Sequence, residues 1–196
     1  MARSFIHIVP PEQAEGRMAK LYGSILDEQG RTVNVYAVHS LRPATLQGHM
    51  SLYRGILRHS DLALPLWFRE ALGTYVSALN GCGYCVHHHA SNLRAALDDE
   101  ARAEEVIHAI ESDRPAEALE DKQAAAFAYA RKLTLAPAEI VEADVETLRA
   151  AGYDDGEILE INQIAAYYAY ANRTVLGLGV TAEDEPERGE PHGESQ

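Results

Sequence analysis

Residues 80–89 read Asn80-Gly81-Cys82-Gly83-Tyr84-Cys85-Val86-His87-His88-His89 and contain the only two cysteines of the chain. Asn-Gly is a strong helix stop, because glycine readily adopts the left-handed conformation that ends a helix. After the cysteines, helical spacing continues through Leu93, Ala96 and Leu97. The segment therefore predicts a turn between two helices, with a Cys-x-x-Cys pair at the start of the second.

Helical periodicity extends from this segment in both directions. Proline, aspartate pairs and Asn-Gly are typical start and stop signals, and they separate eight predicted helices. The helices cover about residues 10–30, 43–59, 65–80, 82–97, 99–111, 119–133, 137–152 and 154–172. We expect the Val- and Tyr-rich residues 32–40 to form a loop, since a lone strand would have no partner. The pattern predicts an all-α fold.

Composition limits the remaining possibilities. With 196 residues and 46% hydrophobic residues, we expect one domain over residues 1–180, followed by an acidic polar tail over 181–196. The net charge of −13 and the lack of a basic cluster argue against nucleic acid and anionic membranes as partners. No targeting signal is evident, and no apolar run approaches the roughly 18 residues of a membrane span. We therefore expect a cytoplasmic protein.

The dithiol has the spacing of a reactive site. On a helix, Cys82, Cys85 and His89 stand at i, i+3 and i+7 and share one face. In the first turn, unpaired N–H groups and the helix dipole stabilise a thiolate. His88 can lean toward this face, whereas His87 points away. Because cross-link stabilisation grows with the loop enclosed, so short a loop indicates redox chemistry or metal binding.

The preceding helix contributes one carboxylate. Glu70 is the only acidic residue between Asp61 and Asp98, and it shares a helical stripe with Gly73, Thr74 and Ser77. A solvated stripe would normally carry several long charged side chains. This stripe is therefore expected to face protein, with Glu70 near a group that needs a base. The competing interpretation is an ordinary surface glutamate, or an ion-pair partner of Arg69 or Arg94.

Together these residues carry a family resemblance. Glu70, Cys82, Cys85 and His89 reproduce the E-x(11)-C-x-x-C-x-x-x-H pattern of the alkylhydroperoxidase D-like, or carboxymuconolactone decarboxylase, superfamily. Residues 76–85 (VSALNGCGYC) resemble its peroxidase-related subfamily, as do residues 161–168 (INQIAAYY) and 171–180 (ANRTVLGLGV). The resemblance implies an AhpD-like fold with an internally duplicated helical core. Residues 33–97 would carry the site, and residues 117–180 would form a degenerate second copy serving as scaffold or interface.

The resemblance also implies a function. It implies a thiol-dependent peroxidase in which Cys85 attacks the hydroperoxide and Cys82 resolves the sulfenic acid to a disulfide. Glu70 and His89 would relay protons. An external dithiol, carried on a lipoyl-bearing partner in the best-known members, would reduce the disulfide without any bound cofactor. The family also implies a homo-oligomer, from dimer to hexamer. Tyr84 departs from the pattern, because the best-known members have histidine between the cysteines.

Three alternatives remain open. Cys82, Cys85, His88 and His89 could bind a metal, although all four come from one helix start and closed structural sites usually draw ligands from two segments. The decarboxylase or lactone chemistry of other superfamily members is a second alternative, and those members typically lack the dithiol. A non-enzymatic helical interaction protein is the third, and it leaves Glu70 and His89 unexplained.

Overall fold

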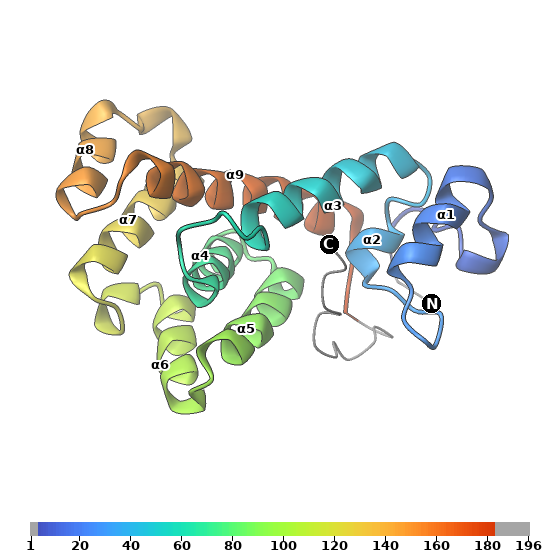
Figure 1. Ribbon diagram of the computed structural model, residues 1–196, viewed down its shortest axis with the longest axis horizontal. Helices are drawn as coiled ribbons and strands as arrows, with labels where there is room; N and C mark the ends of the chain where they lie inside the picture. The colour runs from blue at the N-terminus through green and yellow to red at the C-terminus, as the bar shows by residue number, and fades with distance from the viewer. Residues whose placement is uncertain (1–3, 183–196) are drawn as a thin grey trace. The chain divides into compact units, whose positions relative to one another are not determined.

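The computed structural model describes residues 4–182 of the chain, and in this range the fold is all-α. The described residues form nine α-helices and three short 3-10 helices, without a strand (Figure 1). The α-helices are α1 (Gly16–Ile25), α2 (Asn34–Ala37), α3 (Pro43–Leu57), α4 (Leu66–Leu79), α5 (Gly83–Leu97), α6 (Glu100–Glu111), α7 (Asp121–Leu135), α8 (Glu142–Ala150) and α9 (Asp155–Leu178). The 3-10 helices are η1 (Pro11–Gln13), η2 (Pro115–Glu117) and η3 (Pro137–Glu139). The prediction of an all-α fold is confirmed.

Individual helix limits differ from the prediction in four places. The helix predicted over residues 10–30 is interrupted, because Ala14 and Glu15 are extended between η1 and α1. The helix also ends at Ile25, before the predicted residue 30. The chain turns there, and the Asp27 carboxylate accepts hydrogen bonds from the amides of Gln29 and Arg31. Residues 32–40 contain the short helix α2 in place of a pure loop. Residues 137–152 divide into η3 and α8, and α9 continues to Leu178, six residues beyond the predicted end.

The described chain divides into two compact units. The first comprises residues 4–49 and 177–182, which lie within the unit Met1–His49 and Gly177–Gln196. In this unit, residues near the start of the described chain are hydrogen-bonded to residues near its end. The Phe5 amide donates to the Leu178 carbonyl over 2.7 Å. Asn34 Nδ2 likewise donates to the Thr181 carbonyl over 2.7 Å. These hydrogen bonds tie the two ends of the described chain into one unit. The predicted tail lies outside the described residues, apart from its first two positions.

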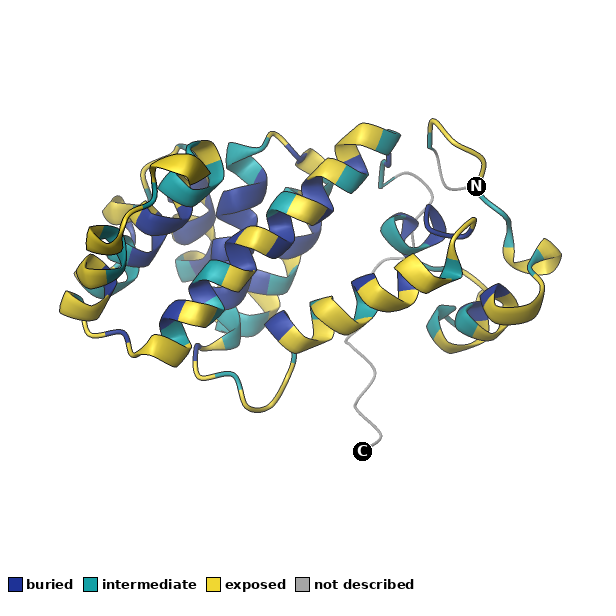
Figure 2. Ribbon diagram, turned by 90° about the horizontal axis from the view of Figure 1, so that it is seen from above, coloured by how far each residue is buried: buried dark blue, intermediate teal, exposed yellow. Residues whose placement is uncertain are grey.

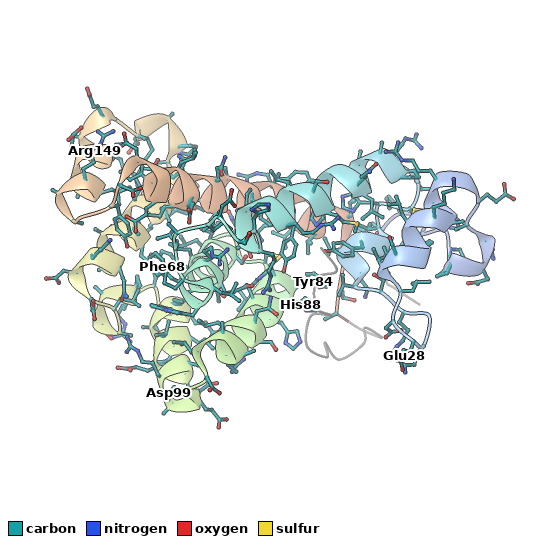
Figure 3. The ribbon with its side chains drawn as sticks, in the orientation of Figure 1. Glu28, Phe68, Tyr84, His88, Asp99 and Arg149 are labelled. Carbon is teal, nitrogen blue, oxygen red and sulfur yellow. The ribbon has the colours of Figure 1, made fainter. Side chains whose placement is uncertain are left out.

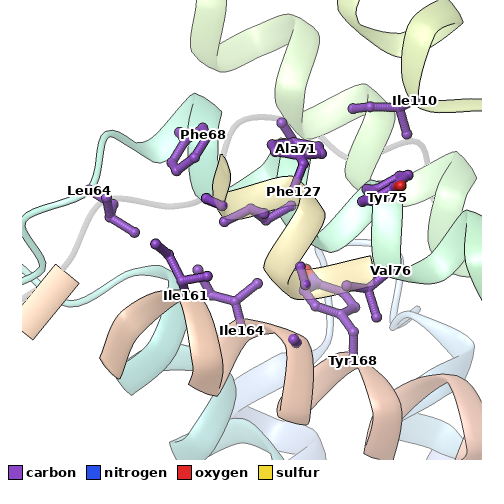
Figure 4. Close-up of a cluster of buried hydrophobic side chains, with 14 of the residues drawn as sticks. Leu64, Phe68, Ala71, Tyr75, Val76, Ile110, Phe127, Ile161, Ile164 and Tyr168 are labelled. Carbon is purple, nitrogen blue, oxygen red and sulfur yellow. The ribbon is translucent and has the colours of Figure 1, made fainter. Parts of the chain in front are cut away.

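The second unit, Met50–Leu176, is built around helix α4. Ten consecutive residues of this helix, Phe68 to Ser77, are buried, and it packs against α5, α6 and α7. Phe127 of α7 fills the centre of the core, with its ring 5.8 Å from Phe68 and 5.1 Å from Tyr75 (Figure 4). Buried residues face the inside of this unit and exposed residues cover its outer helix faces (Figure 2).

Helix α4 is surrounded by other helices, and this explains which residues it contains. A helix buried on all sides must be apolar all round or have its polar groups satisfied internally. The polar stripe of α4 follows this rule, since Glu70, Thr74 and Ser77 are all fully buried. None of the helices in residues 4–182 has an apolar stretch long enough to cross a bilayer.

Candidate dithiol active site

The turn between α4 and α5 places Cys82. Gly81 adopts a positive φ of 69° immediately after the helix ends, a conformation that glycine reaches without steric penalty. The Gly81 amide donates to the Ala78 carbonyl and the Cys82 amide to the Ser77 carbonyl, each over 2.9 Å. This pair of bonds is a Schellman motif, which satisfies the last carbonyls of α4. The predicted stop at Asn80-Gly81 is therefore confirmed, and Cys82 becomes the N-cap residue of α5.

The two cysteines are free thiols buried side by side. Their sulfurs lie 2.9 Å apart, and the residues are 0% and 5% exposed for Cys82 and Cys85 respectively. The hydrogen bond between the two sulfur atoms lowers the pKa of Cys82. The same hydrogen bond, together with burial and the charge on Cys82, raises the pKa of Cys85. The reduced pair therefore ionises once and keeps one proton between its two sulfurs.

Glu70 and His89 meet beneath the same face of α5. Glu70 Oε2 lies 2.6 Å from Nδ1 of His89. Its other oxygen accepts hydrogen bonds from Arg58 Nη2 over 2.6 Å and from Asn92 Nδ2 over 3.2 Å. Burial alone would raise the pKa of Glu70, but these neighbours lower it. Glu70 is thus an ionised, fully buried carboxylate held by three side chains, and its predicted position facing protein is confirmed.

The arginine beside Glu70 differs from both predicted candidates. Arg69 donates from Nη1 to the Leu57 carbonyl over 2.7 Å, and Arg94 pairs with the exposed Glu104. Arg58, on the segment just after α3, forms the ion pair with Glu70. The alternatives of Arg69, Arg94 or a surface position for Glu70 are therefore wrong.

Tyr84 and the other histidines surround the start of α5. His88 is buried, and its ring centroid lies 4.5 Å from that of Tyr84, edge to face (Figure 3). His87 is exposed, as its position on the helix predicts. Among residues 4–182, no group of three or more His, Cys, Asp or Glu side chains is arranged to hold a metal ion.

Two residues of α9 contact the site, and the sequence interpretation treated both as scaffold. The Tyr168 hydroxyl lies 2.9 Å from Nδ1 and 3.1 Å from Nε2 of His89. Asn172 donates from Nδ2 to Ser77 Oγ over 3.0 Å. They stand four residues apart and so share a helix face, as Cys85 and His89 do on α5. This shared spacing is the signal that could have identified them from the sequence.

The proposed internal duplication stays a prediction. In the first copy, Glu70 lies on α4 and Cys82 lies after a turn, at the cap of α5. Their counterparts in the second copy, Glu160 and Asn172, both lie on the uninterrupted helix α9. The helix–turn–helix arrangement of the first copy is therefore not repeated at these positions.

The segment that carries this site is similar to a known protein family. Residues 43–132, which contain all four residues of the Glu-Cys-Cys-His pattern, match the model of the carboxymuconolactone decarboxylase family. Over these residues the chain is similar to that family. A comparison with curated proteins found no match.

Three solved structures are similar to this chain in fold. An uncharacterised peroxidase-related protein from Ralstonia eutropha JMP134, with an alkylhydroperoxidase AhpD core, is 24% identical, with a TM-score of 0.80 over 92% of this chain and 93% of its own. A peroxidase-related protein from Silicibacter sp. TM1040 is also 24% identical, with a TM-score of 0.73 over 92% and 89%. The debrominase Bmp8, as a cysteine-to-alanine variant in complex with 2,3,4-tribromopyrrole, is 18% identical, with a TM-score of 0.68 over 93% and 95%.

Proposed function

We propose that this protein is a thiol-dependent peroxidase of the AhpD-like superfamily that reduces hydrogen peroxide or alkyl hydroperoxides. One observation carries the proposal: two free sulfurs lie 2.9 Å apart on the helix that also supplies His89, which contacts the buried Glu70. A dithiol supplies two electrons, and an imidazole–carboxylate pair can accept and return a proton. Reduction of an O–O bond needs both.

The proton transfers follow from the arrangement of the pair. One proton of the dithiol leaves to His89, and the contact between Nδ1 and Glu70 stabilises the resulting imidazolium. The other proton lies between the sulfurs, so its shift from Cys85 to Cys82 puts the negative charge on Cys85. That shift accounts for attack by Cys85 although Cys82 has the lower pKa in the resting pair.

The chemical steps then balance. The Cys85 thiolate attacks the peroxide oxygen, an S–O bond forms, and the O–O bond breaks. The leaving alkoxide or hydroxide takes the proton from His89 and departs as alcohol or water. The Cys82 sulfur attacks the sulfenic acid on Cys85, forming the disulfide and releasing water. An external dithiol, for which a lipoyl-bearing protein is the proposed carrier, restores both thiols by exchange.

The test measures thiols and peroxide together. Titration of the reduced full-length protein with one equivalent of cumene hydroperoxide should consume two thiols per chain and yield one cumyl alcohol. The variant Cys85→Ser should lose this reaction, whereas His87→Ala, altered at an exposed position on the same helix, should keep it. Thiols that survive excess peroxide would refute the proposal.

The same experiment separates the other candidate reactions. A dithiol that becomes a disulfide could also supply the two electrons for removing bromine, the activity named for Bmp8. Parallel incubation with tribromopyrrole, followed by bromide release, would detect that chemistry. A decarboxylase reaction would survive replacement of both cysteines by serine, whereas neither dithiol reaction can.

A further inference from the structure

Three helices of the second unit each contribute two residues, one turn apart, to the site that contains the dithiol. The pairs are Gly73 and Ser77 on α4, Cys85 and His89 on α5, and Tyr168 and Asn172 on α9. Side-chain contacts join them as two layers. In one layer Tyr168 lies against Gly73 and His89, and in the other Asn172 lies against Ser77 beside the sulfurs.

The first layer holds Tyr168 in one position. A Cβ atom at Gly73 would stand 2.3 Å from the Tyr168 ring, so the tyrosine occupies the space that any other residue at position 73 would fill. Tyr168 is fully buried and projects from α9 into the core (Figure 4). Its ring packs edge to face on His89, with centroids 4.7 Å apart. The hydroxyl is therefore held within 3.1 Å of both ring nitrogens of His89.

The protonation of this layer follows from its neighbours. Burial and the nearby charge of Glu70 raise the pKa of Tyr168 well above its ordinary value, so its hydroxyl keeps its hydrogen. Nδ1 of His89 donates its hydrogen to the Glu70 carboxylate. The Tyr168 hydroxyl is then placed to donate to Nε2, 3.1 Å away, which accepts hydrogen bonds in that tautomer.

The second layer holds an amide beside the sulfurs. Asn80 Nδ2 donates to Oδ1 of Asn172 over 2.9 Å, and Asn172 Nδ2 donates to Ser77 Oγ over 3.0 Å. These two contacts fix the amide so that its NH₂ group faces Ser77 on α4. Ser77 connects this layer to the dithiol, because its carbonyl accepts a hydrogen bond from the Cys82 amide over 2.9 Å. The proximity of the Asn172 amide lowers the pKa of both cysteines. A primary amide has two N–H bonds, so it can donate to Ser77 and to a sulfur together.

We propose that Asn172 is a further catalytic residue, donating a hydrogen bond to the reacting thiolate, and that Tyr168 is a positioning residue that keeps Nε2 of His89 oriented for proton transfer. The inference rests on the proposed peroxidase function for its biological purpose. When the thiol ionises, its proton goes to Nε2 of His89, and the Tyr168 hydroxyl changes from donor to acceptor of the hydrogen bond with that nitrogen. The Asn172 amide stabilises the charge left on sulfur. When the peroxide bond breaks, the proton passes from His89 to the leaving oxygen.

The Asn172 assignment is tested by thiol ionisation, which needs no peroxide. The pH dependence of thiolate ultraviolet absorbance should shift upward by about one pH unit in Asn172→Leu, since a hydrogen bond to a charged group is lost. Asn172→Asp keeps the shape of the side chain and should shift the ionisation upward as well, through charge repulsion. The matched control is Asn162→Leu on the same helix, where the lost hydrogen bond is to the Tyr129 hydroxyl. An ionisation curve of Asn172→Asp that matches wild type would overturn the assignment.

The Tyr168 assignment is tested by the state of His89. In Tyr168→Phe, which keeps the ring, the nitrogen NMR signal of Nε2 should move toward the position of an acceptor that has lost a hydrogen bond. Peroxide-driven thiol loss should slow by at least about tenfold. Tyr129→Phe is the control, because it also removes one buried hydroxyl from a hydrogen bond. An unchanged Nε2 signal would overturn the role. Both spectroscopic tests can succeed even if wild type fails to consume peroxide, so the two proposals are separable.

Discussion

Glu70 Oε2 and His89 Nδ1 lie 2.6 Å apart, although the residues are 19 positions apart on two different helices. Glu70 is fully buried and His89 is 8% exposed, so the contact is shielded from water. Arg58 holds the second oxygen of the same carboxylate. The buried charge of Glu70 on α4 thus contacts His89 on α5 and Arg58, which directly follows α3. Its loss should therefore affect both the stability of the fold and the chemistry of the site.

The variant Glu70→Gln should lose activity and stability together. The amide cannot stabilise an imidazolium as a carboxylate does, so peroxide-driven thiol oxidation should slow by about 10²-fold. Arg58 would also lose its buried partner, and breaking such a pair costs on the order of 3 kcal/mol of unfolding free energy. Stopped-flow thiol loss and urea denaturation measure the two effects.

The matched control for this variant is Glu104→Gln. Glu104 pairs with Arg94, and their side chains are 54% and 43% exposed. Exposed pairs contribute little, so neither the unfolding free energy nor the rate of thiol oxidation should change measurably. Equal effects of the two variants would contradict the role given to Glu70.

Acidification should remove the stability that Glu70 contributes. Its folded-state pKa is lower than the ordinary value of 4.5, so its contribution is complete above about pH 4.5. It is lost as the pH falls below 4.5 through the lower folded-state value. Denaturation curves at a series of pH values should therefore show a steeper acid loss for wild type than for Glu70→Gln. A constant difference between the two proteins from about pH 5 to pH 3 would exclude this linkage.

Local signals were sufficient to predict much of this site. Asn80-Gly81 predicted the turn, because only glycine reaches the required φ without strain. The i, i+3 and i+7 spacing predicted the shared face of Cys82, Cys85 and His89, and the isolated acid on a small-residue stripe predicted a buried Glu70. Each signal involves residues within one or two turns of a helix, where geometry is fixed by the 3.6-residue period.

Contacts between distant segments were not predictable in the same way. Tyr168 lies 79 positions from His89, and Arg58 lies 12 positions before Glu70 beyond a loop. Which arginine reaches a buried carboxylate depends on how helices pack, and the sequence offered several candidates. The homo-oligomer, the duplicated core and the cytoplasmic location stay predictions. The first and third concern other molecules and the cell, and the second concerns the evolutionary origin of the chain, so the contacts within one chain do not test them.

The two cysteines should differ in the oxidation products they leave. If Cys85 attacks the peroxide, Cys82→Ser should accumulate a sulfenic acid on Cys85, since no thiol remains to resolve it. Cys85→Ser should form none at comparable peroxide. Trapping with dimedone and mass spectrometry of the modified peptide measure both. Sulfenic acid on Cys82 in Cys85→Ser, with none on Cys85 in Cys82→Ser, would reverse the two assignments and agree with the lower pKa of Cys82.

The close approach of α9 to α4 should make Gly73 intolerant of any side chain. A Cβ atom at this position would stand 2.3 Å from carbon atoms of the Tyr168 ring, which is fully buried. Gly73→Ala should therefore destabilise the protein by about 1–3 kcal/mol, the usual cost of overpacking a core.

Gly55 on α3 is the matched control, because it is exposed and a Cβ there meets nothing within 4 Å. Gly55→Ala should stabilise by up to about 1 kcal/mol through helix propensity. Because Tyr168 would be displaced from His89, Gly73→Ala should also slow thiol oxidation. A variant as stable and as fast as wild type would show that α9 does not hold Tyr168 against this site.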